Sequence, residues 1–386
     1  MQSFGPHKLV GMSKREVKRM YEFLLGNEAY QFDLDNLTLY YSDKSYSLNR
    51  YAHPPKNRVY FKLTRSCNLT CIYCFQKTDL RTNSPVQIDK FSDSIDKLLA
   101  QENTLFYIFG GEPFLDSQYE NIQYLLRKGS HEFYVFTNGC FSAQYRTLIP
   151  NYIKQLKFII TLDGTEMVHN SRRKFPAHNS FQTIVDNLDF LRYIGATVIL
   201  QINVDISNLD EIVPLFEFIN NRYGINCIDV VLNPVLHCSS APVDLLLLEK
   251  YVELDNRYGL SRCTLNNKVV KKLTRILSGQ GIDCSRCNVD RTYVIDFESK
   301  DIYCCPQSKS TKIGQFSEHE ICIDREVYNN AFLNNQKLLE PCYRCRYRTI
   351  CGYGCVVDTT SFSKCHIDIE NQLQFILKNI NHFMKY

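Results

Sequence analysis

The sequence predicts an α/β fold, a partial (β/α)6 TIM-like barrel followed by a small cysteine-rich domain. Short apolar runs alternate with longer helical stretches from about Arg58 onward, and strands that alternate with helices form parallel sheets with right-handed crossovers. The unusual cysteine and glycine motifs fall directly after predicted strands, where barrels of this kind place their chemistry. A second dense group of cysteines occupies the chain from Cys284 onward.

The predicted elements follow one another in a regular order. Strands are expected at residues 59–63, 105–109, 132–136, 158–162, 197–204 and 227–232. Helices are expected between them at residues 88–101, 118–128, 143–155, 181–195 and 209–223. The predicted domains are an N-terminal extension over 1–57, the barrel over 58–240, a helical bridge over 241–283 and the cysteine-rich domain over 284–386.

The two ends of the chain carry smaller elements. The N-terminal extension is expected to hold a helix over 13–25 and a hairpin of 30–34 against 37–41. It either packs as a cap on the barrel or binds a leader peptide by strand addition. A last helix is expected over 371–384.

Length, composition and charge limit the kind of protein. With 386 residues, 44% of them hydrophobic, the chain can bury a large core. A formal net charge of +4 without a basic tail gives no footprint for nucleic acid. Because no stretch is apolar enough to cross a membrane and the first residues lack the layout of a signal peptide, we expect a cytoplasmic protein. In that reducing compartment the 17 cysteines indicate metal binding rather than disulfides.

The loop after the first strand contains three cysteines, Cys67, Cys71 and Cys74, separated by three and then two residues. A 4Fe-4S cluster takes four protein thiolates, so three thiolates leave one iron open, as catalytic metal sites keep a position for a reacting ligand. From the spacing alone, a zinc knuckle or three buried thiols are the alternatives.

This pattern, with Tyr73 before its last cysteine, resembles the signature of the radical S-adenosylmethionine (SAM) enzymes. The resemblance implies a 4Fe-4S cluster on the three cysteines, with the amino and carboxylate groups of SAM bound at the open iron. It also places against the methionine end of SAM the segment after the second strand, Gly110, Gly111, Glu112 and Pro113. Two glycines let a backbone approach a ligand closely, although an ordinary turn is the alternative.

Later strand ends supply further side chains that the resemblance brings to SAM. The candidates for contacts to its carboxylate, ribose or adenine are Tyr73, Asn138, Thr161, Asp163, Arg172 and Asn203. Arg173 is the alternative to Arg172 for an ion pair with the SAM carboxylate. Tyr73 either packs on the adenine or shields the cluster, and His169 is not expected to bind metal. The ordinary alternative for each is a turn at a strand end or a solvated charge.

The last part of the chain carries a second pattern, Cys-x2-Cys-x5-Cys-x3-Cys, which resembles the SPASM extension of radical SAM enzymes. That resemblance implies two auxiliary 4Fe-4S clusters, three clusters in all. The implied ligands of the outer cluster are Cys342, Cys345, Cys351 and Cys365. The implied ligands of the inner cluster are Cys284, Cys287, Cys305 and Cys355. From this part alone, zinc is the alternative, because zinc ribbons use similar pairs of cysteines.

Two departures from the SPASM pattern affect the inner cluster. Adjacent Cys304 and Cys305 are both possible ligands, and alignment on Tyr303 favours Cys305. The spacing of the upstream pair leaves open whether Cys284 is a ligand, and without it the inner cluster has an open iron able to bind a substrate thiol. The other cysteines are interpreted as buried apolar residues, namely Cys140, Cys227, Cys238, Cys263, Cys304 and Cys322.

Together these features predict a radical SAM peptide maturase. The resemblance implies a 5'-deoxyadenosyl radical that abstracts hydrogen from a ribosomally synthesised precursor peptide, giving an oxidative crosslink or a related modification. Its partners would be that peptide and a reductant such as flavodoxin or ferredoxin. The residues do not reveal the catalytic base.

Two other functions stay open at this point. An anaerobic sulfatase-maturating enzyme, which forms formylglycine, shares the architecture but has an aspartate where this chain has Pro306. A non-catalytic iron-sulfur protein that carries electrons or binds a peptide is the alternative from another class. The glycine segment at 110–113 disfavours it, because an electron carrier has no need of SAM.

Overall fold

The six predicted strands are all present in the computed structural model, which describes residues 56–76, 85–175, 179–235, 243–277, 291–307, 311–328 and 365–384 and the strand backbone of 30–33, 38–41 and 44–47. They are β4 (Asn57–Lys62), β6 (Thr104–Phe109), β7 (Phe133–Thr137), β8 (Leu156–Thr161), β10 (Thr197–Val204) and β11 (Asp229–Pro234). All six lie in one sheet in the order β11-β10-β8-β7-β6-β4, and each neighbouring pair is parallel.

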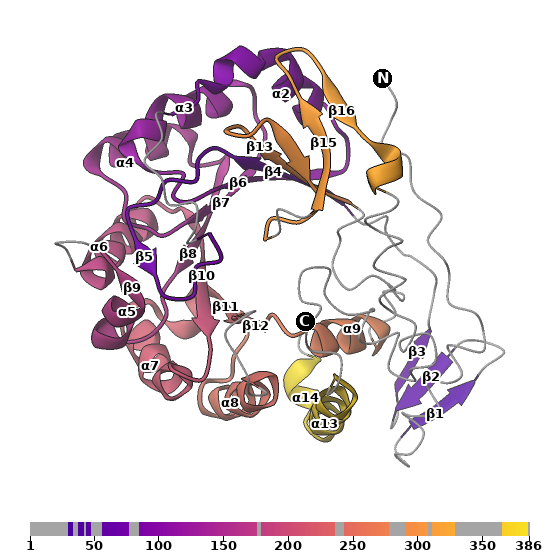
Figure 1. The fold of residues 1–386 in the computed structure, drawn as a ribbon. Helices are drawn as coiled ribbons and strands as arrows, with labels where there is room; N and C mark the ends of the chain where they lie inside the picture. Colours follow the sequence, from indigo (N-terminus) through magenta and orange to yellow (C-terminus); the bar gives the residue numbers. More distant parts are fainter. Residues whose placement is uncertain are drawn as a thin grey trace. The chain divides into compact units, whose positions relative to one another are not determined.

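Helices connect the strands and cover the outer face of the curved sheet (Figure 1). They are α2 (Ser92–Leu99), α3 (Tyr119–Arg127), α4 (Ala143–Leu148), α5 (Glu166–Arg172), α6 (Ser180–Tyr193), α7 (Ile212–Tyr223) and α8 (Val243–Tyr258). Short 3-10 turns precede or follow several of them, namely η2 (Ile88–Phe91), η3 (Asp116–Gln118), η4 (Ile149–Tyr152), η5 (Leu209–Glu211) and η6 (Ile225–Cys227). The described strands do not close into a ring, which confirms the partial barrel.

The two faces of the sheet differ in burial. In β7, Phe133 and Val135 are fully buried, whereas the alternate residues Tyr134 and Phe136 are half-buried. The buried face packs on the helices: Phe158 of β8 lies 6.0 Å from Phe114, whose ring lies 4.7 Å from Tyr145 of α4. Period-two alternation therefore gives the outer face to the helices and leaves the inner face partly open.

Local signals fix the helix ends. The Asn179 side chain caps α6 by accepting a hydrogen bond from the Gln182 N–H at 3.0 Å. Helix α7 ends at Gly224, whose φ of +74° is accessible to glycine at little cost. These helix ends return the chain to the sheet, where the next strand begins.

The sheet continues on both sides beyond the predicted strands. On one side β12 (Cys263–Leu265) pairs in parallel with β11. On the other, β13 (Thr292–Asp296) pairs in parallel with β4 and leads into an antiparallel meander (Figure 1). The meander strands are β14 (Asp301–Tyr303), β15 (Lys312–Phe316) and β16 (Ile321–Ile323). The sequence did not predict this extension.

The chain divides into two compact units, 56–265 with 289–332, and 1–55 with 266–288 and 333–386. The second unit contains the predicted hairpin, in which β1 (Tyr30–Asp33) pairs antiparallel with β2 (Thr38–Tyr41), and a further strand β3 (Lys44–Ser47). It also contains α9 (Lys268–Leu277), α13 (Cys365–Lys378) and α14 (Ile380–Phe383). The Asn267 amide donates to Gln372 at 2.9 Å, which links α13 to the start of α9.

Two further predictions are tested by these elements. The C-terminal helix is confirmed, although it begins at Cys365 and breaks at Asn379. The predicted helix over 13–25 lies outside the described residues. Among the helices that are described, none has the length and apolar character needed to cross a membrane.

The interpretation of the spare cysteines is partly wrong. Cys140, Cys263 and Cys304 are buried as expected, but Cys227 and Cys322 are exposed. Cys227 ends the 3-10 turn η6, and Cys322 is the middle residue of β16 at the edge of the sheet, so neither position faces the core. Cys238 lies outside the described residues.

Candidate SAM and iron-sulfur site

The cysteine loop, residues 64–75, leaves the carboxyl end of β4 and is held by main-chain hydrogen bonds. Its strand β5 (Thr70–Cys71) pairs antiparallel with β9 (Arg173–Lys174), the short strand after α5. The Ile72 N–H donates to the Arg172 carbonyl at 2.9 Å. The cysteine loop, which begins after β4, is therefore fixed to β9 in the segment that follows β8. In the sheet, β7 and β6 lie between β8 and β4.

The thiols of the loop are half-buried. The Cys67 sulfur accepts the Leu69 N–H at 3.4 Å and the Asn138 side-chain amide at 3.8 Å. Asn138 also donates to Asn68 at 2.6 Å. Burial raises the pKa of the Cys67 thiol to about 12 and also raises that of Cys71, so these groups form thiolates when a metal takes the place of the proton.

The surroundings of Cys67 are compatible with a ligand of an iron-sulfur cluster, because its sulfur already accepts two hydrogen bonds. Hydrogen bonds to the sulfurs, such as those that Cys67 already accepts, are a usual feature of iron-sulfur sites.

Gly110 and Gly111 lie against the base of the loop with no room for a side chain. A Cβ on Gly110 would lie 2.4 Å from the Thr64 carbonyl oxygen, and one on Gly111 would lie 2.1 Å from that of Ser66. The Gly111 N–H donates to the Thr64 carbonyl at 2.8 Å. The glycines thus position the cysteine loop itself, a role that the sequence did not reveal. Pro113, which follows them, is buried.

The Glu112 carboxylate is directed into the protein. It is 1% exposed and accepts hydrogen bonds from the Phe114 N–H at 2.8 Å, the Thr137 hydroxyl at 2.7 Å and the Asn138 N–H at 2.6 Å. Burial raises its pKa to about 7, while these three donors act in the opposite direction. The carboxylate therefore joins the loops after β6 and β7.

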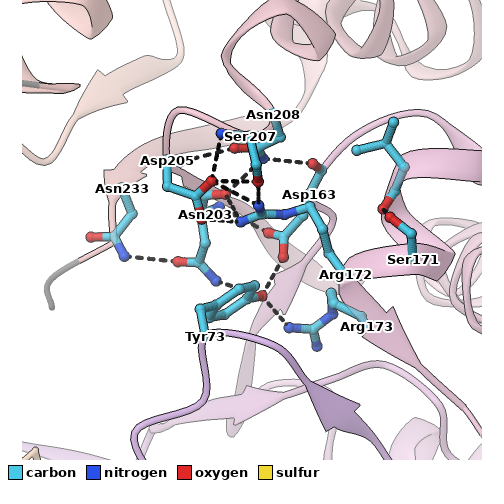
Figure 2. Close-up of polar contacts among 11 residues, drawn as sticks. Tyr73, Asp163, Ser171, Arg172, Arg173, Asn203, Asp205, Ser207, Asn208 and Asn233 are labelled. Atoms are coloured by element: carbon cyan, nitrogen blue, oxygen red, sulfur yellow. Dashed lines mark hydrogen bonds and ion pairs between the residues drawn. The ribbon is translucent and has the colours of Figure 1, made fainter. Parts of the chain in front are cut away.

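Tyr73 belongs to a polar network rather than to an open aromatic surface (Figure 2). Its hydroxyl donates to the Asp163 carboxylate and accepts from Arg173 at 2.7 Å and from Asn203 at 3.2 Å. The Arg172 guanidinium lies 5.1 Å from the centre of its ring. The tyrosine between two cysteines of the loop is thereby tied to the ends of β8 and β10.

Asp163 is the centre of this network and is fully buried. Its second carboxylate oxygen accepts the Asn203 N–H at 2.9 Å, and its own N–H donates to Nδ1 of His169 at 3.1 Å. His169 is consequently an uncharged acceptor at Nδ1. The carboxylate of Asp163 therefore organises the ends of β8 and β10.

The remaining strand-end candidates lie on the inner face. Asn203 accepts at its side-chain oxygen from Asn233 at 2.8 Å (Figure 2). The same oxygen accepts from Gln201 at 2.9 Å. Thr161, at the end of β8, is half-buried and lies opposite Gln201 in the pairing of β8 with β10. A row of polar side chains therefore follows the carboxyl ends of these parallel strands.

Arg172, which the sequence favours for the SAM carboxylate, forms an internal ion pair in the structure. Arg172 is 2% exposed, and its two terminal nitrogens each donate to one oxygen of Asp205 at 2.9 Å. Burial by itself raises the pKa of Asp205, but the bonds from Arg172 and Ser207 bring it below its usual value. This bidentate pair leaves Arg172 committed to the loop after β10.

Arg173 is the arginine available to an anion. It lies opposite Cys71 in the β5–β9 pairing and is 5% exposed. One terminal nitrogen donates to Tyr73, whereas its buried Nε has no hydrogen-bond partner. Within the described part of the chain no carboxylate lies within 4 Å of it. A buried cation next to a loop thiol suits a negatively charged cluster or the carboxylate of SAM.

Most of the predicted auxiliary ligands lie outside the described residues, namely Cys284, Cys287, Cys342, Cys345, Cys351 and Cys355. Cys365 is the first residue of α13. Cys304 and Cys305 follow β14, and Cys304 is 5% exposed while Cys305 is more open. Burial raises the pKa of Tyr60, and Cys305 adds to this effect, which places Cys305 near the inner aromatic residues of β4.

The sequence missed two pairs of polar residues around this site. Asp205 and Asn208 follow a predicted strand, a position that signals function, and Asn208 donates to the Asp163 carbonyl at 2.7 Å. Asp296 and Glu298 approach the cysteine loop from β13, through a pairing that no local pattern indicates.

Comparison with known proteins agrees with this site. Residues 58–185 match the sequence family described as a 4Fe-4S single cluster domain. Fe-coproporphyrin III synthase of Methanosarcina barkeri is 23% identical over 183 residues, which are 45% of this chain and 44% of that protein. The chain thus matches less than half the length of this curated relative.

Two solved structures share the fold over most of the chain. Native anSMEcpe with bound AdoMet and the Cp18Cys peptide has a TM-score of 0.66 and 17% identity, covering 86% of this chain and 99% of its own. Streptococcus suis SuiB bound to the precursor peptide SuiA has a TM-score of 0.57 and 14% identity, covering 78% of this chain and 72% of its own. The comparisons confirm the resemblance to radical SAM enzymes in the fold and in the cluster domain.

Proposed function

We propose that this chain, radical SAM in its fold and in its 4Fe-4S cluster domain, is a peptide maturase that oxidises a ribosomally synthesised precursor peptide and forms a crosslink or related modification. The observation that supports this most is the placement of Cys67, Cys71 and Cys74 on a loop at the carboxyl end of a parallel sheet, against Gly110 and Gly111. Barrel enzymes carry their chemistry at that edge.

The residues present suit a cluster with SAM. The three thiols would hold three irons, and SAM at the fourth supplies, after one-electron reduction, a 5'-deoxyadenosyl radical that abstracts hydrogen from the peptide. Arg173 would pair with the SAM carboxylate through its buried and unpartnered Nε. Tyr73 and Asp163 hold Arg173 and the loop in register, because the Tyr73 hydroxyl contacts both.

The auxiliary clusters give the proposal its oxidative character. A crosslink removes two hydrogens from the peptide, one as a hydrogen atom and one as a proton with an electron. An iron-sulfur cluster near the inner face is a suitable acceptor for that electron, and Cys305 lies there. We assign the inner cluster to Cys284, Cys287, Cys305 and Cys355, and the outer cluster to Cys342, Cys345, Cys351 and Cys365. Flavodoxin or ferredoxin would supply the first electron.

Two solved structures of similar fold support the proposal of a peptide substrate. The anSMEcpe structure contains the Cp18Cys peptide and the SuiB structure contains its precursor peptide SuiA. Shared fold at this level of identity does not choose between their reactions. The residue after Cys305 does bear on the choice, because Pro306 offers no carboxylate where a sulfatase-maturating enzyme has an aspartate base.

The test is mass spectrometry of peptides incubated without oxygen with the reconstituted chain, SAM and reductant. The peptides are those encoded beside the gene and one sulfatase-type peptide. A neighbouring peptide that loses two hydrogens and resists fragmentation between two residues supports a crosslinking maturase. Conversion of the sulfatase-type peptide alone to an aldehyde establishes formylglycine formation instead, and a reduced chain that leaves SAM intact is a non-catalytic iron-sulfur protein.

Alanine variants separate the clusters in the same assay. Cys355→Ala and Cys365→Ala are expected to reduce product formation more than reductive SAM cleavage. Equal product from these variants and from the unchanged chain would remove the auxiliary clusters from the mechanism.

A further inference from the structure

Two acidic residues of the β13–β14 hairpin reach the base of the cysteine loop. Asp296 is the last residue of β13, and Glu298 lies in the turn before β14. Because β13 pairs in parallel with β4, this turn lies beside the point where the chain leaves β4 for the cysteines. More than 230 residues separate the partners along the chain.

Glu298 binds the loop backbone directly. One of its carboxylate oxygens accepts the Arg65 N–H at 2.8 Å and the Thr64 hydroxyl at 3.1 Å. The Thr64 hydroxyl in turn accepts the Ser66 N–H at 3.0 Å. The carboxylate therefore fixes the conformation of residues 64–66, which immediately precede Cys67.

Asp296 holds the side chains of the same segment. Its Oδ2 lies 2.8 Å from the Arg65 guanidinium and 3.1 Å from the Lys62 ammonium, and the aspartate side chain is 1% exposed. The Phe297 N–H donates to the Lys62 carbonyl at 3.2 Å. Two cations therefore balance the charge of one buried acid at this contact.

The opposite side of the loop base is also closed. The backbone of Gly110 and Gly111 contacts Thr64 and Ser66 so tightly that neither glycine has space for a Cβ. The Glu112 N–H donates to the Ser66 carbonyl at 2.8 Å. Residues 64–66 are thus held between the glycine segment and Glu298, and removal of either contact would loosen them.

We propose that Glu298 is a positioning residue for the cysteine loop and that the β13–β14 turn links this loop to the hairpin that carries Cys305. The purpose of this link rests on the proposed function. It is to hold the SAM-binding cluster and the inner auxiliary cysteine in one rigid unit. Only β14 and Cys304 separate the end of the turn from Cys305. A change at one cysteine site is therefore transmitted to the other through Glu298, Thr64 and Arg65.

The experiment compares amide hydrogen exchange in fragments covering residues 63–69 of the full chain. Glu298→Ala removes the acceptor of two hydrogen bonds, so exchange at the Arg65 and Ser66 amides should be about tenfold faster or more. Glu298→Gln keeps an amide oxygen in the same place and should stay within about threefold of the unchanged chain. That rescue distinguishes positioning from a general requirement for the charge.

Lys312→Gln is the matched control. It removes the ion pair of Lys312 in β15 with Asp301 in β14 at 2.6 Å, in the same antiparallel meander, on a lysine that is 46% exposed, without contact to the cysteine loop. Should Glu298→Ala loosen the whole chain, Thr64→Val tests the same contact from the other partner and should speed exchange at Ser66. Exchange in 63–69 that is equal in Glu298→Ala, Thr64→Val and Lys312→Gln would overturn the proposal.

The second readout is the electron paramagnetic resonance spectrum of the reduced, reconstituted chain with and without SAM. Glu298→Ala should alter the SAM-dependent change in the loop cluster's signal, whereas Glu298→Gln and Lys312→Gln should preserve it. Identical spectra in all variants would count against the link. The exchange measurement needs no turnover, so a chain that modifies no peptide defeats the proposed function while leaving the positioning role supported or refuted on its own.

Discussion

Replacing Gly111 with alanine is the sharpest perturbation of the cysteine loop that the structure offers. The new Cβ would lie 2.1 Å from the Ser66 carbonyl oxygen and 2.7 Å from that of Arg65, whereas ordinary contacts begin at 3.4 Å. All of these neighbours are backbone atoms, so no side chain can rotate away. The two segments must separate by about 1 Å, and a misplacement of about 1 Å can cost about 100-fold in rate.

The expected result is a fall of about 100-fold in kcat/KM for reductive SAM cleavage, or about 2.7 kcal/mol of transition-state stabilisation. The assay measures 5'-deoxyadenosine formed by the reduced, reconstituted chain, together with its iron content and melting temperature. Gly195→Ala is the control, because it adds the backbone cost of a φ of +76° while no atom lies within 4 Å of the new Cβ, so no neighbour is displaced.

The comparison separates local displacement from general destabilisation. Both variants should lose some thermal stability, but Gly195→Ala should cleave SAM at nearly the unchanged rate. If Gly111→Ala cleaves SAM as fast as Gly195→Ala does, the contact between the glycine segment and the loop base does not position the cluster, and the reasoning is refuted.

Three further predictions concern the same site. Alanine at all three thiols of the cysteine loop should abolish SAM cleavage and lower the iron content, and retained cleavage would contradict the cluster assignment. Arg172→Met should reduce the free energy of unfolding in urea by about 3 to 5 kcal/mol, because it leaves buried Asp205 unpaired; Arg222→Met, at an exposed pair, should cost less than about 1 kcal/mol, and similar losses would show that Asp205 is solvated. Burial and the nearby arginines hold the pKa of His169 well below 6.5, so the unfolded chain binds a proton that the native chain excludes. Stability should therefore rise with pH up to about 6.5, and His169→Gln should flatten that slope in urea midpoints between pH 5 and 7.5.

The barrel was predictable because its signals are local. Each strand of the sheet from β4 to β11 is a short apolar run followed by an amphipathic helix, and each expected strand is found with its ends shifted by a few residues. The period of the pattern fixes the element type, and the alternation of strands and helices fixes a parallel order. The loops after these strands were predictable for the same reason.

The pairing of β13 with β4 was not predictable in this way. It pairs Thr292 with Arg58, and no local pattern in either segment indicates its partner strand. The sequence assigned this segment to the cysteine-rich domain because Cys284 and Cys287 precede it, so the contact of Glu298 with the loop base was out of reach. Long-range strand pairing depends on the whole chain, whereas the spacing of residue types reports only on residues close in sequence.

The choice between Arg172 and Arg173 shows the same limit at the scale of one residue. Arg172 ends α5 and Arg173 begins β9, and the sequence favoured the first for SAM. Their surroundings differ, because Arg173 lies opposite Cys71 in the β5–β9 pairing while Arg172 pairs with Asp205. The strand-end position of Asp205 was a usable signal for this pair, since an acid there needs a cation when it is buried.

The distribution of buried charge points to where the ligand's charge belongs. Glu112, Asp163 and Asp205 are buried, and each accepts at least two hydrogen bonds from protein donors. Arg173 differs, since its Nε is buried without a partner and, in the described part of the chain, no carboxylate lies within 4 Å. A buried cation of this kind is costly unless an anion meets it. The Tyr73 hydroxyl joins it to the buried Asp163 carboxylate, and the cysteine loop brings Cys71 beside it. This is why the proposed function assigns the SAM carboxylate to Arg173 rather than to Arg172.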